Sequence, residues 1–528
     1  MKTVAFYTLG CKLNFSETST IKRQLIASGL IESSFNEGAD LFIINTCSVT
    51  ENANKECRRL IRKAKKISPN SRVIITGCYA QLKPESIIEI DGVDLVVGAK
   101  EKFNIFKYLN NFKKGIHGCD INNLDYFPSF SIEERSRSYV KVQDGCNYPC
   151  TYCTIPLARG KSRSDFIKNI ISKIEDIGSK GTKEVVLTGV NIGDYKEPIS
   201  NKNFYDLIKE IEKVDVIDRF RISSIEPNLI TDEIIDFVKN SKKFVPHFHI
   251  PLQSGSDNIL KSMKRRYNTS MYINRIKRIQ EKIENVCIGA DVIVGFPNET
   301  EEEFEKTFKL IKNLKLSYLH VFSFSERENT LANEMKGKID KFIISKRSKR
   351  LRILSEKLKY SYYRKFSNIK KEIIVEDKNK NGKKRVQLSP GNYVDVDVEI
   401  ISSVNQQKLE NDLGLYRVTE NPNHRWLFRT PTLRNITETA PYMHDGSLHT
   451  LEEVVDFYDN GGHQNELLSP LIKKLNLTKK EKRQLIDFMK TLTGENLNLI
   501  VLDAISTPVG DLSSKDPSWG NEKGMGYD

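Results

Sequence analysis

The chain has 528 residues and a formal net charge of +14, with 83 Lys and Arg against 69 Asp and Glu. Hydrophobic residues make up 38% and charged residues 29%, a balance that excludes a disordered or fibrous protein. No apolar run approaches the ~18 residues of a membrane span, and the N-terminus lacks a secretory signal, so we expect a cytoplasmic protein without a membrane partner. Nine cysteines, an odd number, indicate metal or redox chemistry rather than a disulfide framework.

Residues 1–115 alternate strand-like and helical segments. Helices are predicted between the strands, for example at Ser16–Ser28 and Asn54–Ile67. This alternation predicts an α/β domain with an open, mostly parallel sheet. Four short runs are the predicted strands: Val4–Leu9, Leu41–Asn45, Val73–Thr76 and Leu95–Val97.

Residues 132–365 repeat a strand-then-helix pattern, and six such βα units predict a partial (β/α)6 barrel. The predicted strands are Tyr139–Val142, Glu184–Leu187, Phe220–Ser223, His247–Pro251, Ile288–Val294 and Tyr318–Phe324. Short alternating runs within 366–406 predict part of a small β-barrel. Residues 412–497 look like a short helical appendage, and 507–528, rich in Gly, Ser and Pro, are predicted to be disordered.

Positive charge is concentrated between Lys336 and Lys371, where fourteen Lys and Arg face two acidic residues. Leucines at 351, 354 and 358 make this segment an amphipathic helix with a basic face. A solvated helix face, a nucleic-acid contact and a membrane-surface contact all fit this charge. The candidate contacts for nucleic acid are Lys346, Arg347, Lys349 and Arg350.

Cys146, Cys150 and Cys153 form a C-x3-C-x2-C loop directly after the first predicted barrel strand. Three thiolates on one short loop hold three irons of a cubane cluster and leave the fourth iron open to a ligand. A zinc knuckle is the alternative, but a fourth protein ligand is missing nearby. The position at the carboxyl face of a barrel favours catalysis over a structural role.

Cys11, Cys47 and Cys78 each follow one strand of the N-terminal sheet. The carboxyl ends of parallel strands share one edge, so these cysteines are expected to converge in space. A single free cysteine is usually a small buried hydrophobic residue, but three at the same structural position are much less likely to arise by chance. Three further cysteines show no pattern and are interpreted as structural: Cys57, Cys119 and Cys287.

Several motifs resemble the radical S-adenosylmethionine (SAM) methylthiotransferases over residues 1 to about 405. The N-terminal ones are Thr8–Asn14, Asn45–Thr50 and Thr76–Cys78; the others are Cys146–Gly160, Ser162–Ser164, Ile250–Ser256, Met263–Tyr267 and Gly289–Pro297. The resemblance implies two [4Fe-4S] clusters, a radical-SAM cluster on Cys146, Cys150 and Cys153 and an auxiliary cluster on Cys11, Cys47 and Cys78. It also implies two SAM molecules, one as methyl donor and one as radical source, together with an electron donor such as flavodoxin or ferredoxin and a sulfur source.

The family has three substrate branches, which modify isopentenyladenosine in tRNA, threonylcarbamoyladenosine in tRNA, or an aspartate of a ribosomal protein. The segments Gly10–Asn14, Thr46–Ala53 and Ile222–Pro227 resemble the threonylcarbamoyladenosine branch. The expected reaction is methylthiolation at C2 of N6-threonylcarbamoyladenosine at position 37 of tRNA, with isopentenyladenosine as the alternative substrate. Residues 366–406 resemble a TRAM domain that stops early, at about Gln406, and this resemblance fits a tRNA partner for the basic segment.

Further polar residues are candidates for lining the cofactor site: Gly189, Asn191, Ser223, Gln253 and Asp291. The resemblance places the first two where the superfamily contacts the cofactor's amino group, and the others stand at predicted strand ends. For each one, an ordinary satisfied polar group at a barrel mouth is the alternative. Arg159 and Arg163 follow the cysteine loop and are expected either to reach an anionic group or to lie on the surface.

Residues 412–497 resemble the C-terminal end of di-haem cytochrome c peroxidases, through the motifs Phe428–Asn435, Thr439–Ser447 and Leu451–Tyr458. Met443 matches an axial ligand of that family. Covalent haem attachment needs C-x-x-C-H, and no cysteine occurs after Cys287, so no haem is expected. A haem redox protein remains the alternative from another functional class, and a fusion, a truncation or a gene-assembly error each explain the junction.

Overall fold

The computed structural model describes residues 2–366 with short gaps at 48–50, 110–111, 122–123 and 133–136, the backbone of three strands between 375 and 396, and much of 424–493. The chain forms two compact units, Met1–Val398 and Glu399–Asp528. All candidate site residues predicted from the sequence fall in the first unit.

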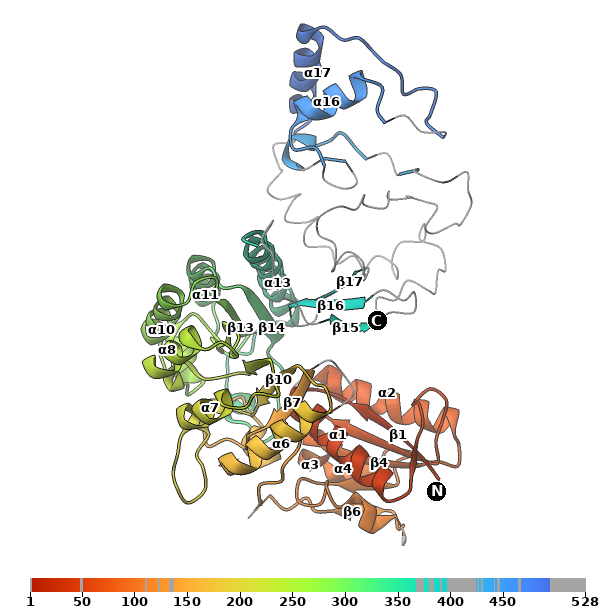
Figure 1. Ribbon diagram of the computed structural model, residues 1–528, viewed down its shortest axis with the longest axis vertical. Helices are drawn as coiled ribbons and strands as arrows, with labels where there is room; N and C mark the ends of the chain where they lie inside the picture. The colour runs from red at the N-terminus through yellow and green to blue at the C-terminus, as the bar shows by residue number, and fades with distance from the viewer. Residues whose placement is uncertain are drawn as a thin grey trace. The chain divides into compact units, whose positions relative to one another are not determined.

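The N-terminal domain is a parallel sheet with strand order β2-β1-β3-β4-β5-β6, drawn in red to orange in Figure 1. Successive residues of its strands point to opposite faces, so Phe42 and Ile44 pack with helix α2 while Leu41 and Ile43 pack with helix α1. Burial on both faces explains the continuous apolar runs and confirms the predicted open α/β sheet. The strands are β1 (Thr3–Thr8), β2 (Ile31–Glu32), β3 (Leu41–Thr46), β4 (Arg72–Gly77), β5 (Leu95–Val97) and β6 (Gly115–His117); the helices are α1 (Lys12–Ala27), α2 (Glu51–Ile67), α3 (Cys78–Leu82) and α4 (Pro84–Ile88).

The central domain contains six parallel strands in the order β7, β10, β11, β12, β13 and β14. They form two three-stranded sheets, which a bridge between Ser224 and His249 connects. Helices cover their outer side (Figure 1), which confirms the predicted partial barrel. The strands are β7 (Arg137–Lys141), β10 (Glu184–Thr188), β11 (Arg219–Ile222), β12 (His247–His249), β13 (Cys287–Val294) and β14 (Tyr318–Ser323). The helices are α5 (Ile155–Arg159), α6 (Ile167–Ser179), α7 (Phe204–Glu212), α8 (Asp232–Asn240), α9 (Asp257–Ser262), α10 (Thr269–Lys282), α11 (Glu301–Leu314), α12 (Leu331–Glu334) and α13 (Lys341–Arg364).

The barrel strands alternate between apolar residues that pack against the helices and polar residues on the inner face. Val185, Phe220 and Phe248 belong to the hydrophobic core between strands and helices. Because side chains alternate along a strand, the residues next to them face inward. We call this inner face the lumen, and its strands contribute titratable side chains: Glu184, Arg221, His247, His249, Asp291, Tyr318 and His320.

A buried ion network connects the N-terminal domain to the barrel. The carboxylate of Glu17 on α1 is fully buried and pairs with Lys102 at 2.6 Å, Arg159 at 2.9 Å and Lys141 at 3.4 Å. Asp144 pairs with the same Arg159 at 3.0 Å and with Lys141 at 3.2 Å. Burial alone would raise the pKa of Glu17, but the three cations lower it to about 2, so this carboxylate is ionised at neutral pH.

The described segments beyond α13 form two small structures. β15 (Val375–Lys378), β16 (Lys384–Ser389) and β17 (Asn392–Val396) make an antiparallel three-stranded sheet within the predicted β module. In the second unit, α16 (Leu451–Asp459) and α17 (Lys479–Thr491) pack around a small apolar cluster. The predicted disordered tail, 507–528, lies outside the described residues. No helix in the described part of the chain is long and apolar enough to cross a membrane.

We expect Glu17→Gln to destabilise the first unit, because it leaves three buried cations without their shared carboxylate. Breaking a buried ion pair in this way costs about 3–5 kcal/mol. Since the folded-state pKa of Glu17 lies below 4.5, the stabilisation is complete above about pH 4.5 and is lost as the pH falls towards 2. Urea unfolding of the cluster-free protein at pH 7 and pH 4 measures both effects. Lys213→Met, which removes an exposed pair with Glu210, is the control and should change the midpoint little.

Candidate active site

The loop that carries Cys146, Cys150 and Cys153 leaves the barrel after β7 through the short strand β8 (Gln143–Asp144). Gly145 has a positive φ of 71°, and a Cβ there would lie 2.1 Å from the carbonyl oxygen of Lys161, so only glycine fits. The loop closes through hydrogen bonds from the Cys146 amide to the Gly160 carbonyl at 3.0 Å and from the Cys153 amide to the Cys150 carbonyl at 3.1 Å.

Hydrogen-bond donors surround the three sulfur atoms of this loop. Backbone amides of Tyr148 and Ile155 donate to Cys146 Sγ and Cys153 Sγ, each at 3.4 Å. Burial raises the pKa of all three thiols, that of Cys146 to about 11 and that of Cys153 to about 12. Amide donors that point at the sulfurs are suited to thiolates bound to metal, because metal binding removes the thiol protons.

Arg265 contacts Cys150, the remaining cysteine of the loop, and was not predicted as a site residue. Its guanidinium donates to Cys150 Sγ at 3.1 Å and to the hydroxyl of Tyr152 at 3.2 Å, and it forms an ion pair with Glu226. The guanidinium also lies over the ring of Tyr267, with its carbon 5.0 Å from the centroid. Arg265 lies in the motif Met263–Tyr267, which was the available sequence signal, but its partners are 39 and 115 residues away in the chain.

Cys11, Cys47 and Cys78 lie at the carboxyl edge of three adjacent strands, β1, β3 and β4. A Cβ on Gly10 would lie only 2.7 Å from Cys47 Cβ and 2.9 Å from Cys47 Sγ, so the first two cysteine loops are in contact. Burial raises the pKa of the Cys78 thiol, and the guanidinium of Arg159 opposes this rise. Cys11 also lies close enough to Cys78 to influence this pKa. The structure thus brings the dispersed cysteines of the sequence to one place.

Asn14 ties these loops together and links them to the barrel. Its side-chain amide donates to the carbonyls of Leu9 at 2.9 Å and Thr46 at 3.0 Å. Its side-chain oxygen accepts a hydrogen bond of 2.6 Å from Arg159. Helix α3, which begins at Cys78, also contacts helix α5, which begins two residues after Cys153. The two cysteine sites are therefore connected through directly packed elements.

Three of the five predicted cofactor-lining residues carry buried polar atoms without a hydrogen-bond partner in the described part of the chain: Asn191 Oδ1, Ser223 Oγ and Gln253 Oε1. The amide of Asn191 donates to Asp194 at 2.9 Å, which fixes its oxygen as the free end. Buried acceptors of this kind need a donor. An ammonium or a ribose hydroxyl supplies one, so these residues fit the polar end of SAM.

The other two predicted lining residues have different surroundings. A Cβ on Gly189 would lie 2.9 Å from Gln143 Oε1, so glycine is needed for Gln143 to approach. Gln143 Oε1 accepts a hydrogen bond of 3.0 Å from the backbone N–H of Asn191. Asp291 receives hydrogen bonds from His249 at 2.8 Å and His320 at 3.2 Å. Burial would raise the pKa of Asp291, but the two histidines hold it far below its usual value. Asp291 therefore belongs to a lumen cluster and has no free acceptor of the kind found at Asn191.

Arg159 and Arg163 do not offer a free guanidinium for an anionic ligand. Arg159 is buried and satisfied by Glu17, Asp144 and Asn14. Arg163 pairs with Asp144 at 3.3 Å and donates to the Arg159 carbonyl at 2.6 Å. Arg159 thereby holds the cysteine loop to the N-terminal domain through residues far away in the sequence, whereas Arg163 is bound by groups in and beside the loop.

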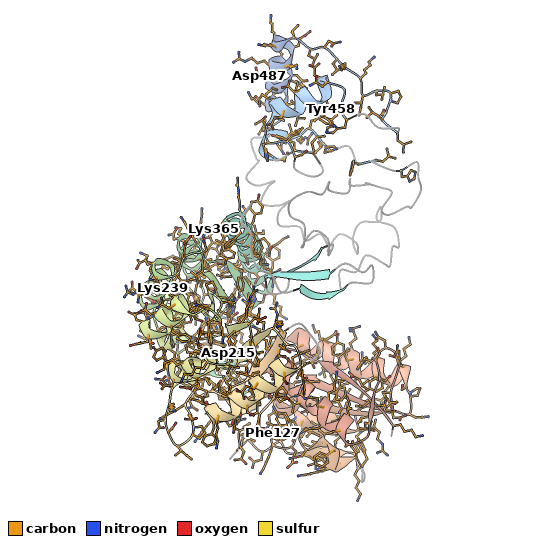
Figure 2. The ribbon with its side chains drawn as sticks, in the orientation of Figure 1. Phe127, Asp215, Lys239, Lys365, Tyr458 and Asp487 are labelled. Atoms are coloured by element: carbon orange, nitrogen blue, oxygen red, sulfur yellow. The ribbon has the colours of Figure 1, made fainter. Side chains whose placement is uncertain are left out.

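The four predicted nucleic-acid contacts on α13 have two kinds of environment. Arg347 is buried and pairs with Glu299 at 3.0 Å and Glu301 at 2.9 Å. Arg350 pairs with the same Glu301 at 3.2 Å. Lys346 is exposed and Lys349 is partly exposed. Figure 2 labels a further exposed cation, Lys365, directly after the end of α13. The arginines therefore anchor the helix, and the lysines form its accessible basic face.

Comparison with known proteins agrees with this geometry. The family model for the radical SAM superfamily matches residues 140–311, and that of the uncharacterized protein family UPF0004 matches residues 3–98. The chain belongs to the radical SAM tRNA methylthiotransferases, enzymes that use an iron–sulfur cluster and SAM. Within the family it is similar to the threonylcarbamoyladenosine tRNA methylthiotransferases MtaB of Bacillus subtilis (strain 168) and Aquifex aeolicus (strain VF5).

The Bacillus subtilis protein is 40% identical over 388 residues, which cover 71% of this chain and 85% of that protein. The Aquifex aeolicus protein is 36% identical over 403 residues, which cover 74% of this chain and 96% of that protein. The tRNA-2-methylthio-N(6)-dimethylallyladenosine synthase of Hydrogenobaculum sp. (strain Y04AAS1) is 33% identical over 387 residues, which cover 71% of this chain and 88% of that protein.

Two partial similarities to solved structures carry no functional argument. The radical SAM methyltransferase TsrM of Kitasatospora setae has a TM-score of 0.48 and 12% identity, over 63% of this chain and 74% of that chain. A MauG-like protein associated with microbial copper homeostasis has a TM-score of 0.16 and 45% identity, over 17% of this chain and 32% of that chain.

If Cys146, Cys150 and Cys153 hold an iron–sulfur cluster, Arg265→Leu is expected to lower its reduction potential, because it removes a positive donor that favours the more negative reduced form. The shift should be on the order of 50 mV, about a tenfold change in the equilibrium constant of a one-electron couple. Redox titration followed by electron paramagnetic resonance measures it. Arg275→Leu, which removes a surface pair with Asp232, is the control. An unchanged potential in Arg265→Leu would contradict the assignment.

Proposed function

We propose that the protein adds a methylthio group at C2 of N6-threonylcarbamoyladenosine at position 37 of tRNA. The observation that carries the proposal is the junction of the two cysteine sites, where α3 and α5 pack together beside Arg159. A sulfur-delivering site and a radical-generating site must share one substrate, so they must be held at a fixed spacing. A tRNA substrate would also assign the enzyme to the cytoplasm.

Two [4Fe-4S] clusters and two SAM molecules are the proposed cofactors, one cluster supplying the electron that cleaves SAM and the other supplying sulfur. Cys146, Cys150 and Cys153 would hold the first cluster, and Cys11, Cys47 and Cys78 the second. The buried oxygens of Asn191, Ser223 and Gln253 would accept hydrogen bonds from SAM. An electron donor such as flavodoxin or ferredoxin and a source of sulfur are the partners that this chemistry requires.

The threonylcarbamoyl branch is supported by the relatives, since those at 36–40% identity carry that name, whereas the dimethylallyladenosine synthases are 30–33% identical, as is a further MtaB at 32%. Methylthiolation of isopentenyladenosine is the second candidate. Expression in a host without its own methylthiotransferases, followed by mass spectrometry of tRNA nucleosides, decides between them. We expect 2-methylthio-threonylcarbamoyladenosine; recovery of the isopentenyl product alone would establish the second candidate.

We expect Cys150→Ala and Cys47→Ala to fail at different steps. Loss of Cys150 damages the cluster that cleaves SAM, so 5′-deoxyadenosine production should disappear. Loss of Cys47 damages only the sulfur-delivering site, so some SAM cleavage should remain while methylthiolated nucleoside is absent. Both products are measured by mass spectrometry after anaerobic reconstitution, with Cys57→Ala as the control in a buried cysteine outside both triads. Wild-type methylthiolation by Cys47→Ala would refute its assignment.

We expect charge reversal at Lys346 and Lys349 to weaken tRNA binding and to reduce its salt dependence. Each lost phosphate contact removes a slope of roughly 0.9 in log K against log salt on duplex RNA or DNA, and less on single strands. Fluorescence anisotropy at several salt concentrations measures the slope. Charge reversal at Lys213, an exposed lysine on the barrel, is the control. An equal slope in variant and wild type would mean that the basic face of α13 is only a solvated surface.

We propose that residues 412–528 bind no haem and are dispensable for methylthiolation. Truncation after Gln406 leaves the compact unit Met1–Val398 complete. The truncated protein should retain its iron content and its activity on tRNA. A Soret band with stoichiometric haem in the full-length protein, or loss of activity in a soluble truncated protein that keeps its clusters, would instead favour the redox alternative or another role for this segment.

A further inference from the structure

Lys12 belongs to the N-terminal domain but lies at the lumen of the barrel. It follows Cys11 directly and begins helix α1, which packs against β7 (Figure 1). The Lys12 ammonium interacts electrostatically with Arg137 on β7, Arg221 on β11 and Asp291 on β13. Residues of three barrel strands therefore surround its charge, yet Lys12 is exposed to solvent. Lys12 thus lies near charged groups of three barrel strands while part of it remains accessible to solvent.

The other charged groups of this part of the lumen already have partners. Arg221 pairs with Glu184 at 3.0 Å, and Arg137 lies 3.8 Å from the same carboxylate. Asp291 is held by its two histidines, as described above. By contrast, Lys12 has neither a hydrogen bond nor an ion pair with any described residue. Lys12 is therefore the cation of this region that is available to a ligand.

The histidines next to these groups do not change the sign of the local charge. Tyr318 bridges His247 at 3.0 Å and His249 at 3.1 Å through its hydroxyl. Burial lowers the pKa of His247 well below its usual value, so this ring is neutral. Apart from the histidines, three cations, Lys12, Arg137 and Arg221, face two carboxylates, Glu184 and Asp291. The excess positive charge favours an anionic ligand.

The proposed substrate carries such an anion close to the reacting carbon. The threonylcarbamoyl group ends in a carboxylate, which is ionised at neutral pH, and it is attached to the same six-membered ring that carries C2. The isopentenyl group is apolar and offers nothing to a cation. Because Lys12 is adjacent to Cys11 in the proposed sulfur-delivering site, a nucleoside with C2 at that site would bring its N6 substituent near Lys12.

We propose that Lys12 binds the carboxylate of the threonylcarbamoyl group, next to Arg221, and thereby selects this nucleoside over isopentenyladenosine. A compact ammonium suits a single carboxylate oxygen and forms a charge-assisted hydrogen bond with it. A nucleoside without the carboxylate leaves the cation unpaired, which is how a polar site rejects an apolar analogue. This inference rests on the proposed function and names the residue that determines substrate specificity.

The experiment uses anticodon stem-loop RNAs that carry threonylcarbamoyladenosine, its carboxyl methyl ester or isopentenyladenosine. Binding to the reconstituted enzyme is measured by fluorescence anisotropy, and methylthiolation by mass spectrometry. The wild type should bind the acid about 10- to 100-fold more tightly than the ester, the range for one hydrogen bond to a charged group. Lys12→Met should lose this preference, whereas Lys12→Arg should keep most of it.

Lys22→Met is the matched control, because Lys22 lies on the same helix and pairs at the surface with Glu32. It should match the wild type in substrate preference, iron content and RNA-independent 5′-deoxyadenosine production, and the last two are measured in every variant so that a cluster defect is recognised. A raised requirement for SAM in Lys12→Met, with the acid-to-ester preference intact, would mean that Lys12 reads the cofactor's carboxylate and would overturn the proposal.

The wild-type measurement alone is also decisive, whatever the variants do to the clusters. Equal binding of acid and ester would overturn the role of Lys12 even if the acid is the substrate. Failure of the wild type to modify the acid, together with modification of the isopentenyl RNA, would instead overturn the proposed function.

Discussion

The buried pairing of Glu17 with Lys102, Lys141 and Arg159 is the constraint on which the rest of the active site depends. It places a carboxylate from the N-terminal domain among cations that include two from the barrel, where charges are stable only when paired. Arg159 extends the same network to Asn14, and Asn14 holds the loops around the dispersed cysteines. One set of ion pairs thus joins two domains and fixes the two groups of cysteine loops relative to each other.

Around this fixed frame, the polar groups fall into satisfied and unsatisfied sets. Glu17, Arg159 and Arg265 are bound by the chain itself and serve to position other groups. The buried oxygens of Asn191 and Gln253 have no partner among the described residues. All five stand on helices or loops rather than on strands, so the packing of these connections, and not strand alternation, produces the division.

The cysteines and the two sheets were predictable from sequence because their signals are local. Cys47 and Cys78 each follow an apolar strand, and parallel strands necessarily bring such positions to one edge. The roles of Arg347 and Lys12 were not predictable in this way. Arg347 lies in a basic run, but its partner Glu299 is 48 residues away and buries it. Lys12 lies in the motif Gly10–Asn14, before the predicted helix Ser16–Ser28, and only the packing of α1 on β7 brings it to the barrel.

The contact between Gly10 and Cys47 limits which residue position 10 can hold. Because the two loops touch through a glycine without a side chain, they are close within the folded chain. Gly10 also has a positive φ of 104°, a conformation that residues with a Cβ rarely adopt. Any other residue at this position would both strain its own backbone and press against the Cys47 side chain, so the approach of Cys11 to Cys47 depends on a residue that carries no chemistry itself.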